Sequence, residues 1–290
     1  MNGLAATMVA AMLVSGTAHA EEKPRVLWFR ADHPPISILS GPDQDKGAGD
    51  LRGQIFWRRM PDYDHRWVNA PALRIIEQLR ALPNACAPTL MRTPEREAFL
   101  HFSDPVTTLL PNGLITTRRG LERFAQFRRD DGAIWLDKAL AGGARVAVHP
   151  GRSYGAAIDA VLAGRANTPA VVPNAHSDTL LASLRKLTTR DDFDGVVGYA
   201  IELSYLTRTQ GLDGGDLVYL AIAEAPPLGN AAFACAKGEV GERVIARVNA
   251  LLNDPQVQRE VTDSYRDWLP PDAAALYDGL RAAEAAKGSR

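Results

Sequence analysis

Short apolar runs alternate with amphipathic helical patterns along most of this chain. Residues 25–29 read as a buried strand, and the spacing of apolar residues predicts a helix over 51–60. Further strands are expected at 65–68, 84–90, 114–116, 145–148, 170–172, 194–198 and 233–235, and further helices at 72–82, 120–127, 156–163, 177–187, 240–252 and 276–286. Strands that alternate with helices of this length favour parallel sheets covered by helices, so the sequence predicts two α/β units.

The first twenty residues have the composition of a secretory signal. Residues 4–14 are almost wholly apolar, and Ala18-His19-Ala20 is a small-x-small sequence of the kind that signal peptidase cuts. The alternative is a membrane anchor, but the apolar run is far shorter than the ~20 residues that a spanning helix needs. We therefore expect residues 1–20 to be a signal peptide cleaved after Ala20. The mature chain would be periplasmic, with no membrane insertion.

Export affects how the two cysteines are interpreted. Cys86 and Cys235 would lie in an oxidising compartment, where an even number of cysteines favours a disulfide. The alternative is two buried free thiols that pack as small hydrophobic side chains. A bridge that closes so long a loop would stabilise the fold by about 4–5 kcal/mol.

The charge balance excludes whole classes of partner. The chain holds 33 Lys plus Arg and 34 Asp plus Glu, a formal net charge of -1, so no overall field attracts nucleic acid or an anionic membrane. We expect a small solute instead. Residues 62–65, Asp-Tyr-Asp-His, resemble a metal-binding run, but they are nearly consecutive on an expected loop. A solvated turn is favoured there, and we expect neither a metal nor a cofactor.

Residues 151–155, Gly-Arg-Ser-Tyr-Gly, match the G-x-S-x-G motif between an expected strand and an expected helix. A serine hydrolase would use Ser153 with Asp159 and His176, yet such triads take their acid and base from separate later strands. The glycines alternatively serve turn geometry only. In a third interpretation, Ser153 and the unpaired amides at a helix start bind a carboxylate or phosphate without chemistry.

A further pair of motifs resembles a known family. Residues 93–96, Thr-Pro-Glu-Arg, are followed by residues 102–106, Phe-Ser-Asp-Pro-Val. In this the chain is similar to the extracellular solute-binding proteins of family 3, which deliver polar amino acids and related solutes to ABC importers. Those proteins show T-x-x-R followed by F-S-x-P-Y/V. The order of the other segments agrees with the family over residues 21–277.

The resemblance implies an α/β, periplasmic-binding-protein-like fold of type II, in which two lobes are joined by two crossing strands and close on a ligand. Lobe 1 would comprise residues 21–110 and 230–290, and lobe 2 residues 111–229. The implied function is that of a monomeric receptor, not an enzyme. It would present a small polar, amino-acid-like solute to an ABC transporter permease. An orphan sensory module on the same fold is the alternative, and a hydrolase using Ser153 is a weaker one.

The resemblance also implies ligand contacts, chief among them Arg96, whose planar guanidinium matches a carboxylate. The alternative is a surface arginine paired with Glu95 or Asp104. The other contacts that the resemblance implies are His33, Trp67, Thr89, Met91 and Ser153. For His33 and Trp67, ordinary core packing is the alternative.

One position departs from the family pattern. Amino-acid-binding members usually end the D-x-V-V strand with an acid that pairs with the ligand's ammonium group, whereas this chain has Tyr199 there. A tyrosine forms hydrogen bonds but carries no negative charge at neutral pH. Glu202 compensates if its side chain points into the cleft. Otherwise a carboxylate or another polar solute is favoured over an α-amino acid.

Overall fold

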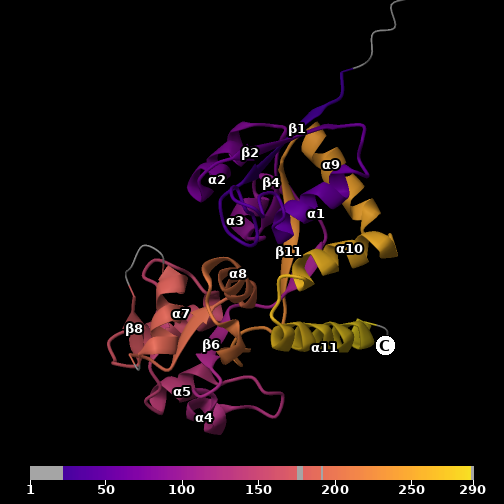
Figure 1. Cartoon of the computed structure of the whole chain (residues 1–290). Helices are drawn as coiled ribbons and strands as arrows, with labels where there is room; N and C mark the ends of the chain where they lie inside the picture. The colour runs from indigo at the N-terminus through magenta and orange to yellow at the C-terminus, as the bar shows by residue number, and fades with distance from the viewer. Residues whose placement is uncertain (1–21, 175–178, 191, 289–290) are drawn as a thin grey trace, which may run out of the picture.

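The computed structural model describes residues 22–174, 179–190 and 192–288, and their strands form two separate sheets (Figure 1). The first sheet has the order β2-β1-β3-β11-β4, with β5 paired to β11. Its strands are β1 (Arg25–Arg30), β2 (Asp64–Asn69), β3 (Ala85–Leu90), β4 (Leu100–Phe102), β5 (Thr107–Leu109) and β11 (Gly229–Ala236). The strand β1 runs parallel to β2 and β3, while β11 runs antiparallel to β3. We call the part built around this sheet lobe 1.

Aromatic side chains fill the core of lobe 1. Trp28, Phe56 and Phe233 are fully buried, and the ring centroid of Phe233 lies 5.5 Å from that of Trp28 and 4.9 Å from that of Phe56. These rings join β1, β11 and a covering helix into one apolar cluster. The helices of this lobe are α1 (Ala48–Trp57), α2 (Ala72–Ala81), α3 (Pro94–Glu97), α9 (Glu239–Leu251) and α10 (Pro255–Arg266).

The second sheet has the order β10-β6-β9-β7-β8 and forms lobe 2. Strand β7 is parallel to β8 and β9, whereas β6 is antiparallel to β9 and β10. The strands are β6 (Gly113–Thr117), β7 (Val146–Val148), β8 (Val171–Pro173), β9 (Gly195–Gly198) and β10 (Leu217–Leu220). The helices are α4 (Leu121–Phe124), α5 (Leu136–Ala141), α6 (Ala156–Gly164), α7 (Thr179–Thr189) and α8 (Ala200–Gln210).

The chain crosses between the lobes twice. It leaves lobe 1 from β5 into β6 and returns from β10 into β11, and β5 pairs antiparallel with β11 beside the crossing. The C-terminal helix α11 (Pro271–Gly288) lies against this junction (Figure 1). Tyr277 of α11 donates a hydrogen bond to the carbonyl of Thr108 at 3.0 Å, and the amide of Leu110 donates to Tyr265 at 2.9 Å. The predicted two-lobed α/β fold with two crossing connections is therefore confirmed.

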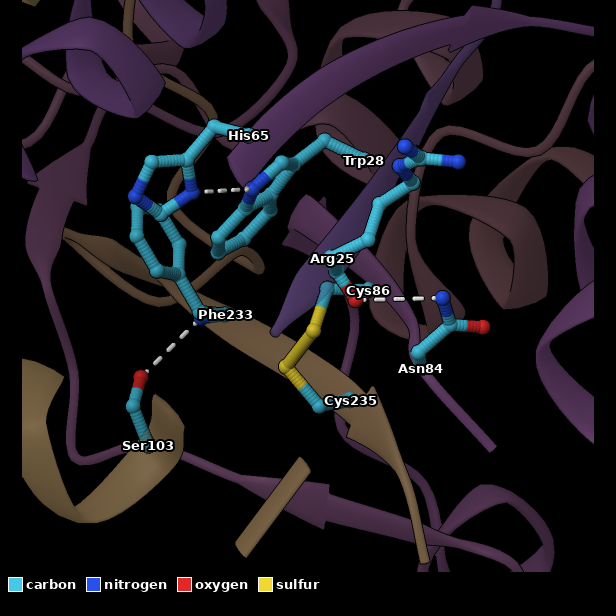
Figure 2. The surroundings of a disulfide bond; sticks show 8 residues. All are labelled: Arg25, Trp28, His65, Asn84, Cys86, Ser103, Phe233 and Cys235. Atoms are coloured by element: carbon cyan, nitrogen blue, oxygen red, sulfur yellow. Dashed lines mark hydrogen bonds between the residues drawn. A yellow bond between two sulfur atoms is a disulfide. The ribbon is translucent and has the colours of Figure 1, made fainter. Parts of the chain in front are cut away.

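Cys86 and Cys235 form the predicted disulfide between neighbouring strands (Figure 2). They face each other in the antiparallel register of β3 and β11, and their sulfur atoms are 2.03 Å apart. Both residues are fully buried. Figure 2 also shows Trp28 donating from Nε1 to Nδ1 of His65 at 3.0 Å beside the bridge. The alternative of two free thiols is wrong.

Residues 62–65 have structural partners. Asp62 lies in an exposed turn, as expected, whereas Asp64 and His65 belong to β2. The carboxylate of Asp64 pairs with Arg25 and Arg66, each at 2.9 Å. Across the described ranges, no group of three or more His, Cys, Asp or Glu side chains is arranged to hold a metal ion. Within the same ranges, the helices are too short or too polar to cross a membrane. The predicted signal peptide lies outside the described residues.

Candidate ligand site between the lobes

The edge of lobe 1 that faces lobe 2 is built from strand ends. The parallel strands β1, β2 and β3 end at one edge of their sheet, where open α/β sheets bind ligands. The loop after β1 carries His33, and Nε2 of His33 lies 3.8 Å from Oε1 of Glu202 in α8. Helix α8 lies on the side of lobe 2 that faces lobe 1 (Figure 1). Two predicted site residues from different lobes are thus brought together.

A buried carboxylate fixes the loop that carries His33. Asp50, in the first turn of α1, accepts hydrogen bonds from the Ser37 hydroxyl at 2.6 Å and the Ile38 amide at 2.9 Å. Arg30, at the end of β1, donates to the same carboxylate at 2.8 Å and to Asp45 at 2.5 Å. The loop is therefore held from both its ends. The sequence analysis missed Asp50, although an acid in the first turn of a helix is a recognisable signal.

On lobe 2, Glu202 is held by an arginine that the sequence analysis did not single out. Oε2 of Glu202 accepts from Nη2 of Arg152 at 2.7 Å and from the Tyr199 amide at 3.1 Å. Burial opposes the charge of Arg152, but its hydrogen bond with Glu202 and their mutual attraction raise the pKa of Arg152. The guanidinium also lies 5.6 Å from the Tyr199 ring centroid. Burial raises the pKa of Tyr199, so this phenol stays neutral.

Ser153 serves the start of α6 in this structure. Its hydroxyl donates to Oδ2 of Asp159 at 2.5 Å, and Oδ1 of Asp159 accepts from the Tyr154 amide at 2.8 Å. Gly151 and Gly155 have φ angles of 79° and 104°, which L side chains rarely adopt, so the turn requires glycine at both positions. His176, the expected base of a hydrolase, lies outside the described residues.

Arg96 lies at the same edge of lobe 1, at the start of α3. The Thr93 side chain caps this helix by accepting from the Arg96 amide at 3.3 Å. Nη1 of Arg96 donates to the Met91 carbonyl at 2.7 Å. The alternative pairing with Glu95 is not formed, because Glu95 pairs with Arg80 at 3.2 Å. Within the described part of the chain, Arg96 has no carboxylate within ion-pair distance.

The remaining predicted contacts differ in their surroundings. Thr89 accepts from Nη1 of the buried Arg52 at 2.9 Å, whereas Met91 is 69% exposed. Trp67 is partly buried and packs against the core of lobe 1, with its ring centroid 4.4 Å from that of Trp57 and 4.3 Å from the Arg30 guanidinium carbon. These contacts are the core packing that was the alternative for Trp67. The predicted role of Trp67 as a ligand wall stays a prediction.

Comparisons of sequence find no match to this chain, whereas comparisons of structure find proteins with the same fold. No protein-family model and no curated protein matches it. An ancestral cationic amino acid solute-binding protein has a TM-score of 0.62 at 16% identity, over 85% of this chain and 95% of that one. A probable amino-acid ABC transporter extracellular-binding protein, ytmK of Bacillus subtilis, has a TM-score of 0.63 at 12% identity, over 87% and 100%.

The chain has the solute-binding-protein fold. A third similar structure is a histidine kinase sensor domain with similarity to periplasmic binding proteins, with a TM-score of 0.54 at 17% identity, over 86% of this chain and 96% of that one. The solute-binding-protein fold thus occurs in both transport and sensory proteins. The resemblance to family 3 is confirmed at the level of the fold.

Proposed function

We propose that this protein is an exported receptor that captures a small carboxylate-bearing solute between its lobes and presents it to an ABC importer. The observation that supports this most is the state of Arg96. Arg96 is partly buried as a residue and has no carboxylate partner among the described residues. It lies on the edge whose loop contacts lobe 2 through His33 and Glu202. A solute carboxylate would supply the missing partner through paired N–H donors.

Closure of the two lobes would follow from this arrangement. A ligand that contacts Arg96 on lobe 1 and the α8 region of lobe 2 interacts more strongly with a closed form than with an open one, and so shifts the population toward closure. Small-angle X-ray scattering should show a smaller radius of gyration when ligand is added. An unchanged radius at saturating ligand would contradict closure.

A thermal-shift screen of amino acids, carboxylates and oligopeptides, followed by calorimetry of the hits, tests the receptor function. We expect Arg96→Ala to weaken binding of the best solute by about 2–5 kcal/mol, because a desolvated charge partner is lost. Arg80→Ala is the matched control, since Arg80 is an exposed arginine that pairs with Glu95 close to Arg96. Retained affinity in Arg96→Ala would remove Arg96 from the site.

A sensory role is the second candidate, and the likeness to a histidine kinase sensor domain favours it. Uptake of the bound solute by cells lacking this protein separates the two roles. A receptor for an importer predicts that uptake falls. Unchanged uptake together with an altered transcriptional response to the solute would favour the sensory role.

A further inference from the structure

We propose, on the basis of the receptor function above, that the solute is an organic monocarboxylate with an apolar body and no ammonium group. The proposal rests on three features of the interlobe edge. The carboxylates on lobe 2 already have partners within the protein, donors on both lobes are open, and apolar side chains on lobe 1 are exposed.

The carboxylates of lobe 2 that could bind an ammonium group already accept hydrogen bonds from the protein. Glu202 is buried, and its Oε2 accepts hydrogen bonds from Arg152 and from the Tyr199 amide. Its Oε1 lies 3.8 Å from Nε2 of His33, beyond hydrogen-bond distance. Asp159, behind Ser153, is likewise held by a hydroxyl and an amide. An ammonium group brought to Glu202 would compete with a guanidinium that is fixed beside it, and like charges repel strongly where water is excluded.

The donors that would bind a carboxylate are open. The hydrogen bonds of the Arg96 guanidinium to described residues use Nη1 alone, and those of Arg152 use Nη2 alone. Each guanidinium therefore keeps Nε and one further nitrogen for a bidentate contact. The charge of Arg152 is already neutralised by Glu202, whereas the charge of Arg96 is not. A solute with a single carboxylate would therefore bind at Arg96.

Two exposed apolar side chains lie at the same edge of lobe 1 as Arg96. Leu73 and Met91 are the large hydrophobic residues that the structure shows as exposed, at 85% and 69%. Leu73 is in the first turn of α2, which follows β2, and Met91 directly follows β3. Because β2 and β3 lie on either side of β1 and parallel to it, both side chains belong to the edge that carries His33. Covering them with an apolar solute body removes their apolar surface from water.

Matched pairs of solutes test the proposal. We expect 4-methylpentanoate and 3-phenylpropanoate to bind at least 10-fold more tightly than L-leucine and L-phenylalanine, which differ from them by the α-ammonium group. Glutarate, with its second carboxylate, should bind more weakly than either 4-methylpentanoate or 3-phenylpropanoate. The inference would be overturned if an amino acid bound as tightly as the matching carboxylate without the ammonium group. It would also be overturned if glutarate bound most tightly. Neither result would contradict the receptor function.

Variants provide a second readout. Arg152→Gln releases Glu202, so we expect it to raise affinity for L-leucine relative to 4-methylpentanoate by at least 10-fold. Arg129→Gln is the control, because Arg129 is an arginine of the same lobe that pairs with Asp131 and lies near the Trp135 ring. An unchanged ratio in Arg152→Gln would overturn the inference. So would the absence of binding by all five solutes, in which case the wider screen decides the receptor function independently.

Discussion

Some arginines near the interlobe edge have carboxylate partners and others have none, and this difference indicates which of them have a structural role. Arg30 is buried and is paired with Asp45 and Asp50, so it holds a loop. Arg52 is fully buried but has no carboxylate partner in the described part of the chain. Its Nη1 donates to Thr89, while Nε and Nη2 find no acceptor there. Burial lowers the pKa of Arg52 to about 10.

Arg52→Met should therefore raise the free energy of unfolding at pH 7, by about 2 kcal/mol. An uncompensated buried charge destabilises the fold, and an apolar side chain of similar length removes that cost. Chemical denaturation of both proteins measures the effect. Arg30→Met is the contrasting variant, because it leaves two carboxylates without their partner and should lower stability. A large loss of stability in Arg52→Met would show that the guanidinium has a partner that the fold requires.

The burial of His149 leads us to expect that the stability of the fold depends on pH. Burial lowers the pKa of His149 below its usual 6.5, and Nδ1 donates to the Asn174 carbonyl at 3.3 Å in the neutral form. The unfolded chain takes up a proton as the pH falls through 6.5, while the folded chain resists it. The free energy of unfolding should thus be greatest above pH 6.5 and fall toward pH 5. His149→Asn should flatten this slope in denaturation curves, and His65, whose pKa burial also lowers, accounts for a remaining part. An equally steep slope in His149→Asn would contradict the assignment.

At the scale of elements, the pairing of β3 with β11 joins distant parts of the chain. The two strands lie in the middle of the first sheet, and the disulfide crosses between residues separated by 149 positions. Most residues of both strands are buried, and both cysteines are fully buried, so the bridge is shielded from solvent. The pairing also fixes where the chain re-enters lobe 1 after lobe 2. The pairing of β3 with β11 and the disulfide between them therefore hold the N-terminal and C-terminal parts of lobe 1 together.

Replacing both cysteines by alanine should lower the free energy of unfolding by about 3–5 kcal/mol, since the unfolded chain regains the freedom of a long loop. Denaturation of the oxidised protein and of Cys86→Ala/Cys235→Ala measures the difference. A reductant present during unfolding should lower the free energy of unfolding of the wild type and leave that of the double variant unchanged. Equal stabilities of the two proteins would show that the bridge contributes little.

At the scale of the whole molecule, the C-terminal helix belongs to neither sheet alone. Ala273 and Tyr277 of α11 are buried in one apolar cluster with Leu217 and Tyr219 of lobe 2, and Tyr277 also bonds to the crossing strand β5. Helix α11 therefore packs over the connection on which any movement of the lobes would turn.

Truncation after Pro270 should lower the free energy of unfolding by about 3 kcal/mol or more, because it exposes the apolar partners of Ala273 and Tyr277. Thermal unfolding of the shortened chain tests this. Truncation after Arg281 is the control, because residues 282–287 are exposed. A Tm that is equal for both truncations would contradict a role for α11 in holding the junction.

The sequence predicted the elements whose periodicity is local. Strands β1 and β3 and helix α2 lie where the apolar spacing placed them, because each has one buried face or run. Strand β2 was also predicted, although its residues are half-buried or exposed. Helix α8 was not predicted. Its residues Ala200, Ile201, Glu202, Leu203 and Ser204 are all buried in succession, since α8 packs within lobe 2 and also beneath the loop of lobe 1. A helix covered on several sides loses the amphipathic pattern on which such a prediction depends.

The sequence by itself determined the order of strands and helices, the pair of cysteines available for a bridge, and the motif that brings Arg96 to the start of a helix. Only the tertiary structure decided which charges are compensated. Arg152 and Glu202 are 50 residues apart, at the starts of α6 and α8, and they meet because β7 and β9 are neighbours in one sheet. A local pattern carries no information about the partner of a charged side chain, since that partner is set by the packing of distant elements.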